Sequence, residues 1–311
     1  MRHMQIEVLE LPLARPFAIS RGTRTAVTVI RVTLEQNGFI GRGECTPTPR
    51  YDETPASVAA ELAALSEEVE AGLSRLDLQT RLSAGSARNA LDCALWRLDA
   101  ALAKQTLWQQ CERVAPPSVI TAETLSLDFS ENMAAAAADA VSRGAILLKI
   151  KLNRDEILEK VAAIRAAAPR ATLVIDANEA WSGVDLHSLL SALQAYNIAM
   201  VEQPLPAGQD QDLQRFTHPI PVCADESCHT REDIAQLHNR YEMINIKLDK
   251  CGGLTEALAM VEEAQKQEMR VMVGCMLGSS LAMEAALPVA IAAEHIDLDG
   301  PIWLAADSSP F

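Results

Sequence analysis

The second part of the chain is built from short apolar runs that alternate with helical stretches, and this alternation limits the fold most strongly. It begins after Pro116 and Pro117, which interrupt the chain. We predict strands at residues 119–125, 146–151, 172–176, 200–202, 222–225, 243–247, 270–274 and 296–299. Helical stretches separate them, at residues 132–143, 155–168, 185–196, 211–216, 231–238, 255–267 and 281–294. Eight strands with seven intervening helices predict an α/β fold, a modified TIM barrel of the (β/α)7β type, because alternating elements of this kind form closed parallel sheets.

The residues before this barrel predict a smaller α+β domain. Polar and apolar side chains alternate in strand fashion at residues 5–13 and 25–34, and Asn37 and Gly38 form a tight-turn signal before the next strand. Thr54 is then placed to cap a helix that has proline at its first position. An antiparallel meander followed by helices is therefore expected.

The domain boundaries follow from this change of pattern. We predict a first domain at residues 1–116, a barrel at 117–299 and a short tail at 300–311. Two loops of the first domain, residues 15–24 and 45–53, are too long for tight turns. Loops of this length are often functional.

Charged residues recur at the ends of the predicted barrel strands. From Lys151 the gaps to Asp176, Glu202, Asp225 and Lys247 are 25, 26, 23 and 22 residues, about one strand–helix unit each. Each residue alone has an ordinary structural reading, as a turn residue, a strand terminator or a helix cap. Because active sites of such barrels lie at the C-terminal ends of the strands, their common register predicts a catalytic site.

Three of these residues are candidate metal ligands. Asp176, Glu202 and Asp225 end adjacent strands, and three carboxylates cannot stay ionised close together without a cation. Oxygen ligands favour Mg²⁺, with Mn²⁺ as the alternative, over zinc. The six histidines include no His-x-x-x-His pair, which also speaks against zinc.

Two lysines are candidate bases. Lys151 and Lys247 end the second and sixth predicted strands, which lie opposite each other in an eight-stranded barrel. They would face a bound substrate from two sides, as removal and return of a proton requires. Lys149 shares a strand face with Lys151, since side chains alternate along a strand. The structural alternative is an edge strand with two solvated lysines.

Composition excludes several classes of partner. The formal charge of −15 argues against nucleic acid and anionic membranes, and no apolar run is long enough to cross a bilayer. Seven scattered cysteines without a Cys-x-x-Cys motif suit a reduced, cytoplasmic protein, and no signal peptide precedes the first strand. Self-association into a homo-oligomer is left open.

The pattern resembles the enolase superfamily, in its muconate-lactonizing subgroup, over essentially the whole chain. The lysines Lys149 and Lys151, the three carboxylates and Lys247 carry the resemblance. Within the subgroup the chain is most similar to the L-Ala-D/L-Glu dipeptide epimerases, in the segments 175–179 (IDANE), 202–206 (EQPLP), 225–230 (DESCHT), 245–250 (NIKLDK) and 297–301 (DLDGP). The seventh strand lacks the histidine of the mandelate racemases. The first domain then corresponds to the capping domain of the family, and the tail is expected to return towards it.

The resemblance implies epimerisation of the second residue of a dipeptide, by proton transfer through a metal-stabilised enediolate and within murein peptide recycling. Lys149 is assigned to the substrate carboxylate, and Asp297 and Asp299 to the substrate ammonium group. Arg24, with Arg21 as the alternative, is expected to bind the glutamate side chain. Two further candidates for substrate binding are Thr121 and Cys275.

Other activities fit parts of the same pattern. A cycloisomerase, an o-succinylbenzoate synthase or an epimerase for other dipeptides would keep the metal and the lysines. A Schiff-base aldolase would use a lysine of the sixth strand without a metal. The acidic pair at Asp297 and Asp299 favours the dipeptide, because only a ligand with an ammonium group needs it.

Overall fold

The computed structural model describes residues 1–307 and consists of a capping domain and a barrel. The capping domain contains a three-stranded antiparallel sheet and the helices that follow it. Its strands are β1 (Arg2–Ile19), β2 (Gly22–Gln36) and β3 (Phe39–Cys45). Its helices are α1 (Pro55–Ala64), α2 (Ser66–Glu70), α3 (Arg75–Arg81), α4 (Ser86–Leu102) and α5 (Leu107–Gln110), with a 3-10 turn η1 (Pro49–Tyr51) before them.

Local sequence explains how this domain is assembled. Thr54 caps α1 as predicted, since its side chain accepts a hydrogen bond from the Ser57 backbone N–H. Strand β3 lies directly on α4, where a Cβ atom at Gly43 would come within 2.0 Å of the Ala90 carbonyl oxygen. Glycine is therefore required at this position for the sheet to approach the helix.

The barrel is a sheet of eight parallel strands in sequence order. They are β4 (Glu123–Leu125), β5 (Leu147–Lys151), β6 (Thr172–Asp176), β7 (Ile198–Glu202), β8 (Val222–Ala224), β9 (Met243–Ile246), β10 (Arg270–Val273) and β11 (His295–Ile296). The edge strands meet where the Ala122 N–H donates to the Ile296 carbonyl, at 2.7 Å. The predicted fold class is thus confirmed, although the first strand is shorter than expected.

Helices cover the outside of this sheet. They are α6 (Ser130–Ser142), α7 (Ile157–Ala167), α8 (Leu186–Leu193), α9 (Arg231–Leu237), α10 (Leu248–Cys251), α11 (Leu254–Lys266) and α12 (Ser280–Ala290). Three 3-10 segments complete the set, η2 (Gln194–Tyr196), η3 (Gln211–Arg215) and η4 (Gly300–Trp303). The helix predicted at residues 211–216 is wrong, because only the 3-10 segment η3 forms there.

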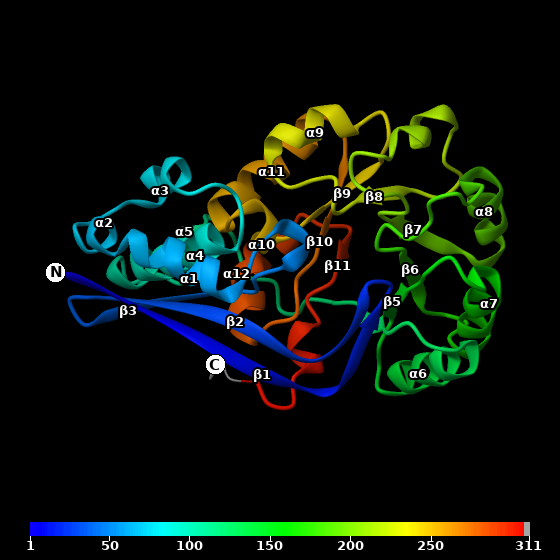
Figure 1. Cartoon of the computed structure of the whole chain (residues 1–311), viewed down its shortest axis with the longest axis horizontal. Helices are drawn as coiled ribbons and strands as arrows, with labels where there is room; N and C mark the ends of the chain where they lie inside the picture. Colours follow the sequence, from blue (N-terminus) through cyan, green and yellow to red (C-terminus); the bar gives the residue numbers. More distant parts are fainter. Residues whose placement is uncertain (308–311) are drawn as a thin grey trace.

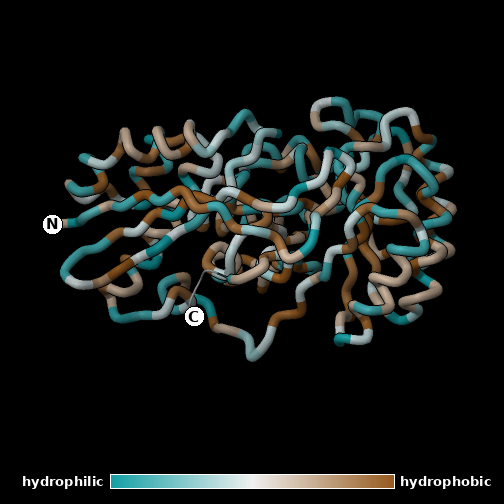
Figure 2. The backbone as a smooth tube through the Cα atoms, turned by 60° about the horizontal axis from the view of Figure 1, so that its bottom comes forward, coloured by the Kyte–Doolittle hydropathy of each residue, from teal (hydrophilic) through white to brown (hydrophobic). Residues whose placement is uncertain are grey.

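Apolar side chains fill the barrel and the layer between strands and helices. Val174, Met200, Met243 and Met272 are fully buried in one cluster. Figure 2 shows hydrophobic segments running through the barrel strands, with hydrophilic segments towards the surface. No helix among residues 1–307 is long and apolar enough to span a membrane.

Contacts at several places hold the capping domain on the barrel. The hairpin of β1 and β2 extends from the capping sheet to the barrel (Figure 1), where Ser20 donates to the Asn178 carbonyl. Asp92 of α4 accepts from the backbone of Thr255, at 2.9 Å, in the first turn of α11. The chain after η4 also pairs with β1, since Ala305 N–H donates to the Pro12 carbonyl at 2.9 Å.

Candidate active site

A pocket of about 440 Å³ lies where the capping domain meets the C-terminal ends of the barrel strands. The tip of the β1–β2 hairpin and the turn η1 supply one wall, which includes Phe17, Arg24 and Tyr51. The barrel supplies the floor, with lysines and carboxylates from several strands. The pocket thus lies at the position at which barrel enzymes carry their active sites.

The three predicted metal ligands come together at the floor. Asp176 ends β6, Glu202 ends β7, and Asp225 follows β8, and each is at most 1% exposed. Burial raises the pKa of Glu202 to about 7, and the neighbouring Asp176 adds to this effect. For Asp225 burial acts in the same direction, but Lys247 and Lys250 outweigh it and hold its pKa well below the ordinary value.

Both predicted bases are buried against these carboxylates. The ammonium group of Lys151 lies 2.6 Å from Asp176, and that of Lys247 lies 2.6 Å from Asp225. Burial alone would lower the pKa of Lys247, but Asp225 and Glu202 raise it above its ordinary value. The lysines therefore approach the carboxylate cluster from two different strands, β5 and the end of β9.

Lys149 is the central cation of the floor. Its ammonium nitrogen lies 3.1 Å from Asp176, 2.8 Å from Glu202 and 2.8 Å from Asp297. The contact with Asp297 was not expected, because we assigned these two residues to opposite ends of the substrate. Since the side chain is 1% exposed, these carboxylates supply almost its whole polar environment.

The floor fits a divalent cation in its donor chemistry. As they stand, no three acidic, histidine or cysteine side chains among residues 1–307 are arranged around a common metal position. Each candidate ligand is paired with lysine instead, and Lys149 places a positive charge between Asp176 and Glu202. The ammonium group of Lys149 thus lies between two of the three carboxylates, and carboxylate oxygens are the ligands that Mg²⁺ prefers.

Asp297 and Asp299 follow β11 and line the pocket, and Lys149 links Asp297 to the carboxylate cluster. The Oδ2 atom of Asp297 accepts from Lys149, whereas its buried Oδ1 has no hydrogen-bond partner within residues 1–307. The Oδ2 atom of Asp299 accepts from the Thr124 backbone N–H at 2.7 Å and from the Trp303 indole at 3.3 Å. One oxygen of each carboxylate therefore remains for a ligand.

The remaining predicted site residues separate into two groups. Arg24 and Cys275 line the pocket, but Thr121 does not. The Thr121 hydroxyl instead accepts from the Leu298 backbone N–H at 2.8 Å and holds the segment between the two aspartates. Burial and the nearby Asp297 raise the pKa of Cys275 well above its ordinary value, which keeps the thiol neutral.

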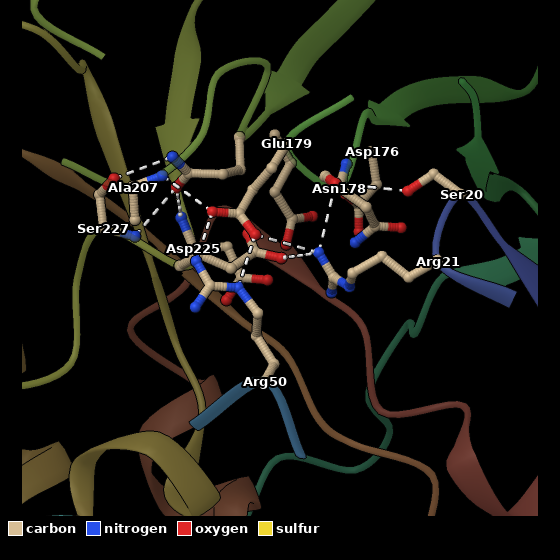
Figure 3. A network of polar contacts seen from close by, with 12 residues as sticks. Ser20, Arg21, Arg50, Asp176, Asn178, Glu179, Ala207, Asp225 and Ser227 are labelled. Atoms are coloured by element: carbon tan, nitrogen blue, oxygen red, sulfur yellow. Dashed lines mark hydrogen bonds and ion pairs between the residues drawn. The ribbon is translucent and has the colours of Figure 1, made fainter. Parts of the chain in front are cut away.

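Arg21 and Arg50 are both paired with acidic residues, and they share Glu179 as a partner. Arg21 donates to Glu226 at 2.9 Å. It also donates to the Asn178 carbonyl at 3.2 Å, as Figure 3 shows. Arg50 forms two hydrogen bonds to Glu179, at 2.8 and 2.7 Å. Among residues 1–307, the side chain of Arg24 has no hydrogen bond or ion pair, so it is the pocket arginine that is available to a ligand.

Several functional candidates were missed at the sequence level. Glu226 and Lys250 are buried beside Asp225, and Lys250 donates to the Cys228 and Asn245 carbonyls at 2.8 and 3.0 Å. Glu226 and Lys250 lie within three residues of Asp225 and Lys247 in the sequence, and this closeness could have indicated that they belong to the site. Glu179 and Arg50 lie 129 positions apart, and no periodicity could have paired them.

Family models cover most of the chain. The C-terminal model, described as enolase C-terminal domain-like, matches residues 132–301. The N-terminal domain of mandelate racemase and muconate lactonizing enzyme matches residues 3–110.

Individual relatives are similar over nearly the full length. An L-Ala-D/L-Glu epimerase of Escherichia coli is 49% identical, with 100% of this chain and 97% of the relative covered. An N-acetyl-D-glutamate racemase of Pseudoalteromonas is 42% identical, with 90% and 88% covered.

Solved structures show the same fold. An enolase family member from Agrobacterium tumefaciens with homology to dipeptide epimerases, solved with sodium and L-Ala-L-Glu, has a TM-score of 0.95 at 46% identity, with 99% of this chain and 94% of that chain covered. A dipeptide epimerase from Enterococcus faecalis, complexed with Mg and L-Leu-L-Tyr, has a TM-score of 0.91 at 29% identity, with 98% and 92% covered.

Proposed function

The chain belongs to the enolase superfamily, with mandelate racemase/muconate lactonizing enzyme domains, and we propose that it epimerises dipeptides by interconverting L-Ala-L-Glu and L-Ala-D-Glu. The observation that carries this proposal is the placement of two buried lysines on one carboxylate cluster. Lys151 reaches it from β5 and Lys247 from the end of β9. Epimerisation needs two proton carriers on opposite sides of one carbon, and two lysines that reach the cluster from different strands support this proposal.

A divalent cation, Mg²⁺ in our proposal, would be held by Asp176, Glu202 and Asp225, where it would supply positive charge for the carboxylate of the reacting residue. The chain's own groups move the proton. One lysine, in its neutral form, takes the proton from the α-carbon, and the opposite lysine, in its charged form, returns a proton to the other face. The proton numbers balance, because the two lysines exchange protonation states in each turnover.

The ends of the substrate would be bound by groups of opposite charge. The free oxygens of Asp297 and Asp299 would accept the ammonium group of the first residue. Arg24 would bind the side-chain carboxylate of the second residue, because Glu226 and Glu179 already neutralise Arg21 and Arg50. Lys149 would contact the substrate's α-carboxylate. In this proposal Thr121 only supports the site, and Cys275 is a neutral part of the pocket wall.

A second activity, racemisation of N-acylated glutamate, shares the same reacting centre. L-Ala-Glu is itself an N-acylated glutamate, and the relative at 42% identity is named for the N-acetyl compound. The acidic pair favours the dipeptide, because an N-acetyl group offers no positive charge to two buried aspartates. We place the reaction in the cytoplasm and in the recycling of cell-wall peptides.

Deuterium incorporation tests this proposal directly. Each purified stereoisomer, L-Ala-L-Glu or L-Ala-D-Glu, is incubated with enzyme and Mg²⁺ in D₂O and followed by NMR. Wild-type enzyme should convert each into the other with one deuterium at the glutamate α-carbon.

The lysine variants separate the two bases. Lys151→Ala and Lys247→Ala should both lose epimerisation, while each retains α-proton exchange with a different stereoisomer. Normal epimerisation by either variant would remove that lysine from the mechanism. Inactivation by borohydride in the presence of substrate would instead support a Schiff base.

A further inference from the structure

The acidic pair at the pocket owes part of its geometry to a residue that does not line the pocket. Trp303 is 2% exposed and lies at the end of η4, four residues after Asp299. Its indole N–H donates to Asp299 Oδ2 at 3.3 Å. The Thr124 backbone N–H binds the same oxygen, at 2.7 Å. Because both donors use Oδ2, the carboxylate is turned so that Oδ1 remains available to a ligand.

The indole is itself fixed by the capping domain. The ring of Phe17, which lines the pocket, packs edge-on against Trp303 with ring centroids 4.7 Å apart. The guanidinium of Arg15 lies 4.4 Å from the Trp303 ring centroid. The next residue, Leu304, forms a β-bridge with Leu13. Trp303 is therefore held by the same strand that carries one wall of the pocket.

Asp299 needs donors of this kind to stay charged. Burial and the neighbouring Asp297 raise its pKa to about 6, while the hydrogen bonds from Thr124 and Trp303 act in the opposite direction. A carboxylate that loses a donor keeps its negative charge less readily. The N–H donors of Thr124 and Trp303 therefore help Asp299 to stay ionised, as the binding of an ammonium group requires.

We propose that Trp303 is a positioning residue for the acidic pair Asp297 and Asp299. It fixes Asp299 so that the enzyme prefers substrates with a free ammonium group over N-acylglutamates that lack one. This inference rests on the proposed function and names a residue that sets its substrate class. Trp303 acts through Asp299 and touches no substrate atom. Its contribution should therefore appear only with ligands that bear the ammonium group.

Two ligands isolate this contribution. N-propanoyl-L-glutamate is L-Ala-L-Glu with a hydrogen in place of the ammonium group. Its competition constant against L-Ala-L-Glu is defined whether or not it is turned over.

Trp303→Phe keeps an aromatic ring beside Phe17 but removes the N–H donor. Trp108→Phe, the same change in the short helix α5, is the matched control.

Trp303→Phe should raise KM for L-Ala-L-Glu about tenfold, the effect of one weak hydrogen bond to a charged acceptor, with kcat within about threefold of wild type. The competition constant of N-propanoyl-L-glutamate should change by less than about twofold, because that ligand makes no use of Asp299. Trp108→Phe should change neither constant.

A variant cycle then tests whether Trp303 acts through Asp299. Asp299→Asn should reproduce the selective loss, and the double variant should be no worse than Asp299→Asn alone. Equal losses for both ligands, additive losses in the double variant, or no loss in Trp303→Phe would overturn the inference. If wild-type enzyme fails to epimerise L-Ala-L-Glu at all, the proposed function falls instead, so the two failures are distinct.

Discussion

Replacing Asp249 with asparagine should make the protein more stable at alkaline pH, because this carboxyl group is buried between the two domains. Asp249 lies in α10 of the barrel and is 9% exposed. Its Oδ1 accepts from the Thr46 backbone N–H at 3.0 Å and from the Asn89 side chain at 2.9 Å, both in the capping domain. Burial raises the pKa of Asp249 to about 7, and the nearby Glu53 and Glu44 add to this effect.

The sign and size of the effect follow from linkage. A carboxyl group whose pKa is higher in the folded protein than in the unfolded chain costs stability as pH rises between the two values. The ordinary value is 3.8, so stability falls from there up to about pH 7. One pKa unit corresponds to about 1.4 kcal/mol, which gives a total cost of about 4 kcal/mol. About 3 kcal/mol of it arises between pH 5 and pH 7.

Asparagine removes this cost and keeps the Oδ1 acceptor for Thr46 and Asn89. The free energy of unfolding is measured by urea denaturation at pH 5 and pH 8, with coincident fluorescence and circular dichroism transitions as the condition for its use. The advantage of Asp249→Asn over wild type should be about 3 kcal/mol greater at pH 8 than at pH 5. The exposed Asp212→Asn is the control and should show no such difference. A stability difference for Asp249→Asn that is the same at both pH values would refute the linkage argument.

Further predictions concern specificity, the metal and the domain contact. Arg24→Ala should raise KM for L-Ala-L-Glu about 10- to 100-fold, because a charge-assisted ion pair is lost. The KM for L-Ala-L-Met should change by less than about threefold. Equal changes in KM for both dipeptides would show that Arg24 does not recognise the substrate side chain. Dialysis against a chelator should abolish turnover, and added Mg²⁺ should restore it. Full activity of the dialysed, metal-free enzyme would show that Asp176, Glu202 and Asp225 do not act as ligands of a catalytic metal. Gly43→Ala should lower the free energy of unfolding by about 3 kcal/mol, because the new Cβ meets the backbone of α4, and an unchanged urea midpoint would contradict that packing.

The barrel could be predicted because its evidence is periodic. Each strand–helix unit adds between 22 and 26 residues, so a charged residue at one strand end implies the position of the next. The structure places Lys151, Asp176 and Glu202 at the ends of β5, β6 and β7, as the spacing requires. The helix predicted at residues 211–216 does not form, because this segment is only a 3-10 turn in which Leu213 is the one buried residue.

Contacts made by loops could not be predicted in the same way. Arg21 and Arg24 are three residues apart in one hairpin, and composition cannot tell which of them is neutralised. The structure decides it, because Glu226 and Glu179 both pair with Arg21. Glu179 is held for this role by a left-handed backbone, with φ of 67°, in the turn directly after β6. Such a conformation is costly for a residue other than glycine and is often retained at functional sites.

Under the proposed function, the charge arrangement of the pocket would let an acidic protein select an acidic substrate. The chain carries a net charge of −15, which repels anions at long range. At the pocket, however, Glu226 and Glu179 neutralise Arg21 and Arg50, so that on the capping side Arg24 is the one arginine among the described residues 1–307 that offers a free positive charge. A ligand with one side-chain carboxylate would match that single charge, and its ammonium group would match the acidic pair Asp297 and Asp299. Specificity in the proposed site would therefore depend as much on the arginines that are already paired as on the one that is left.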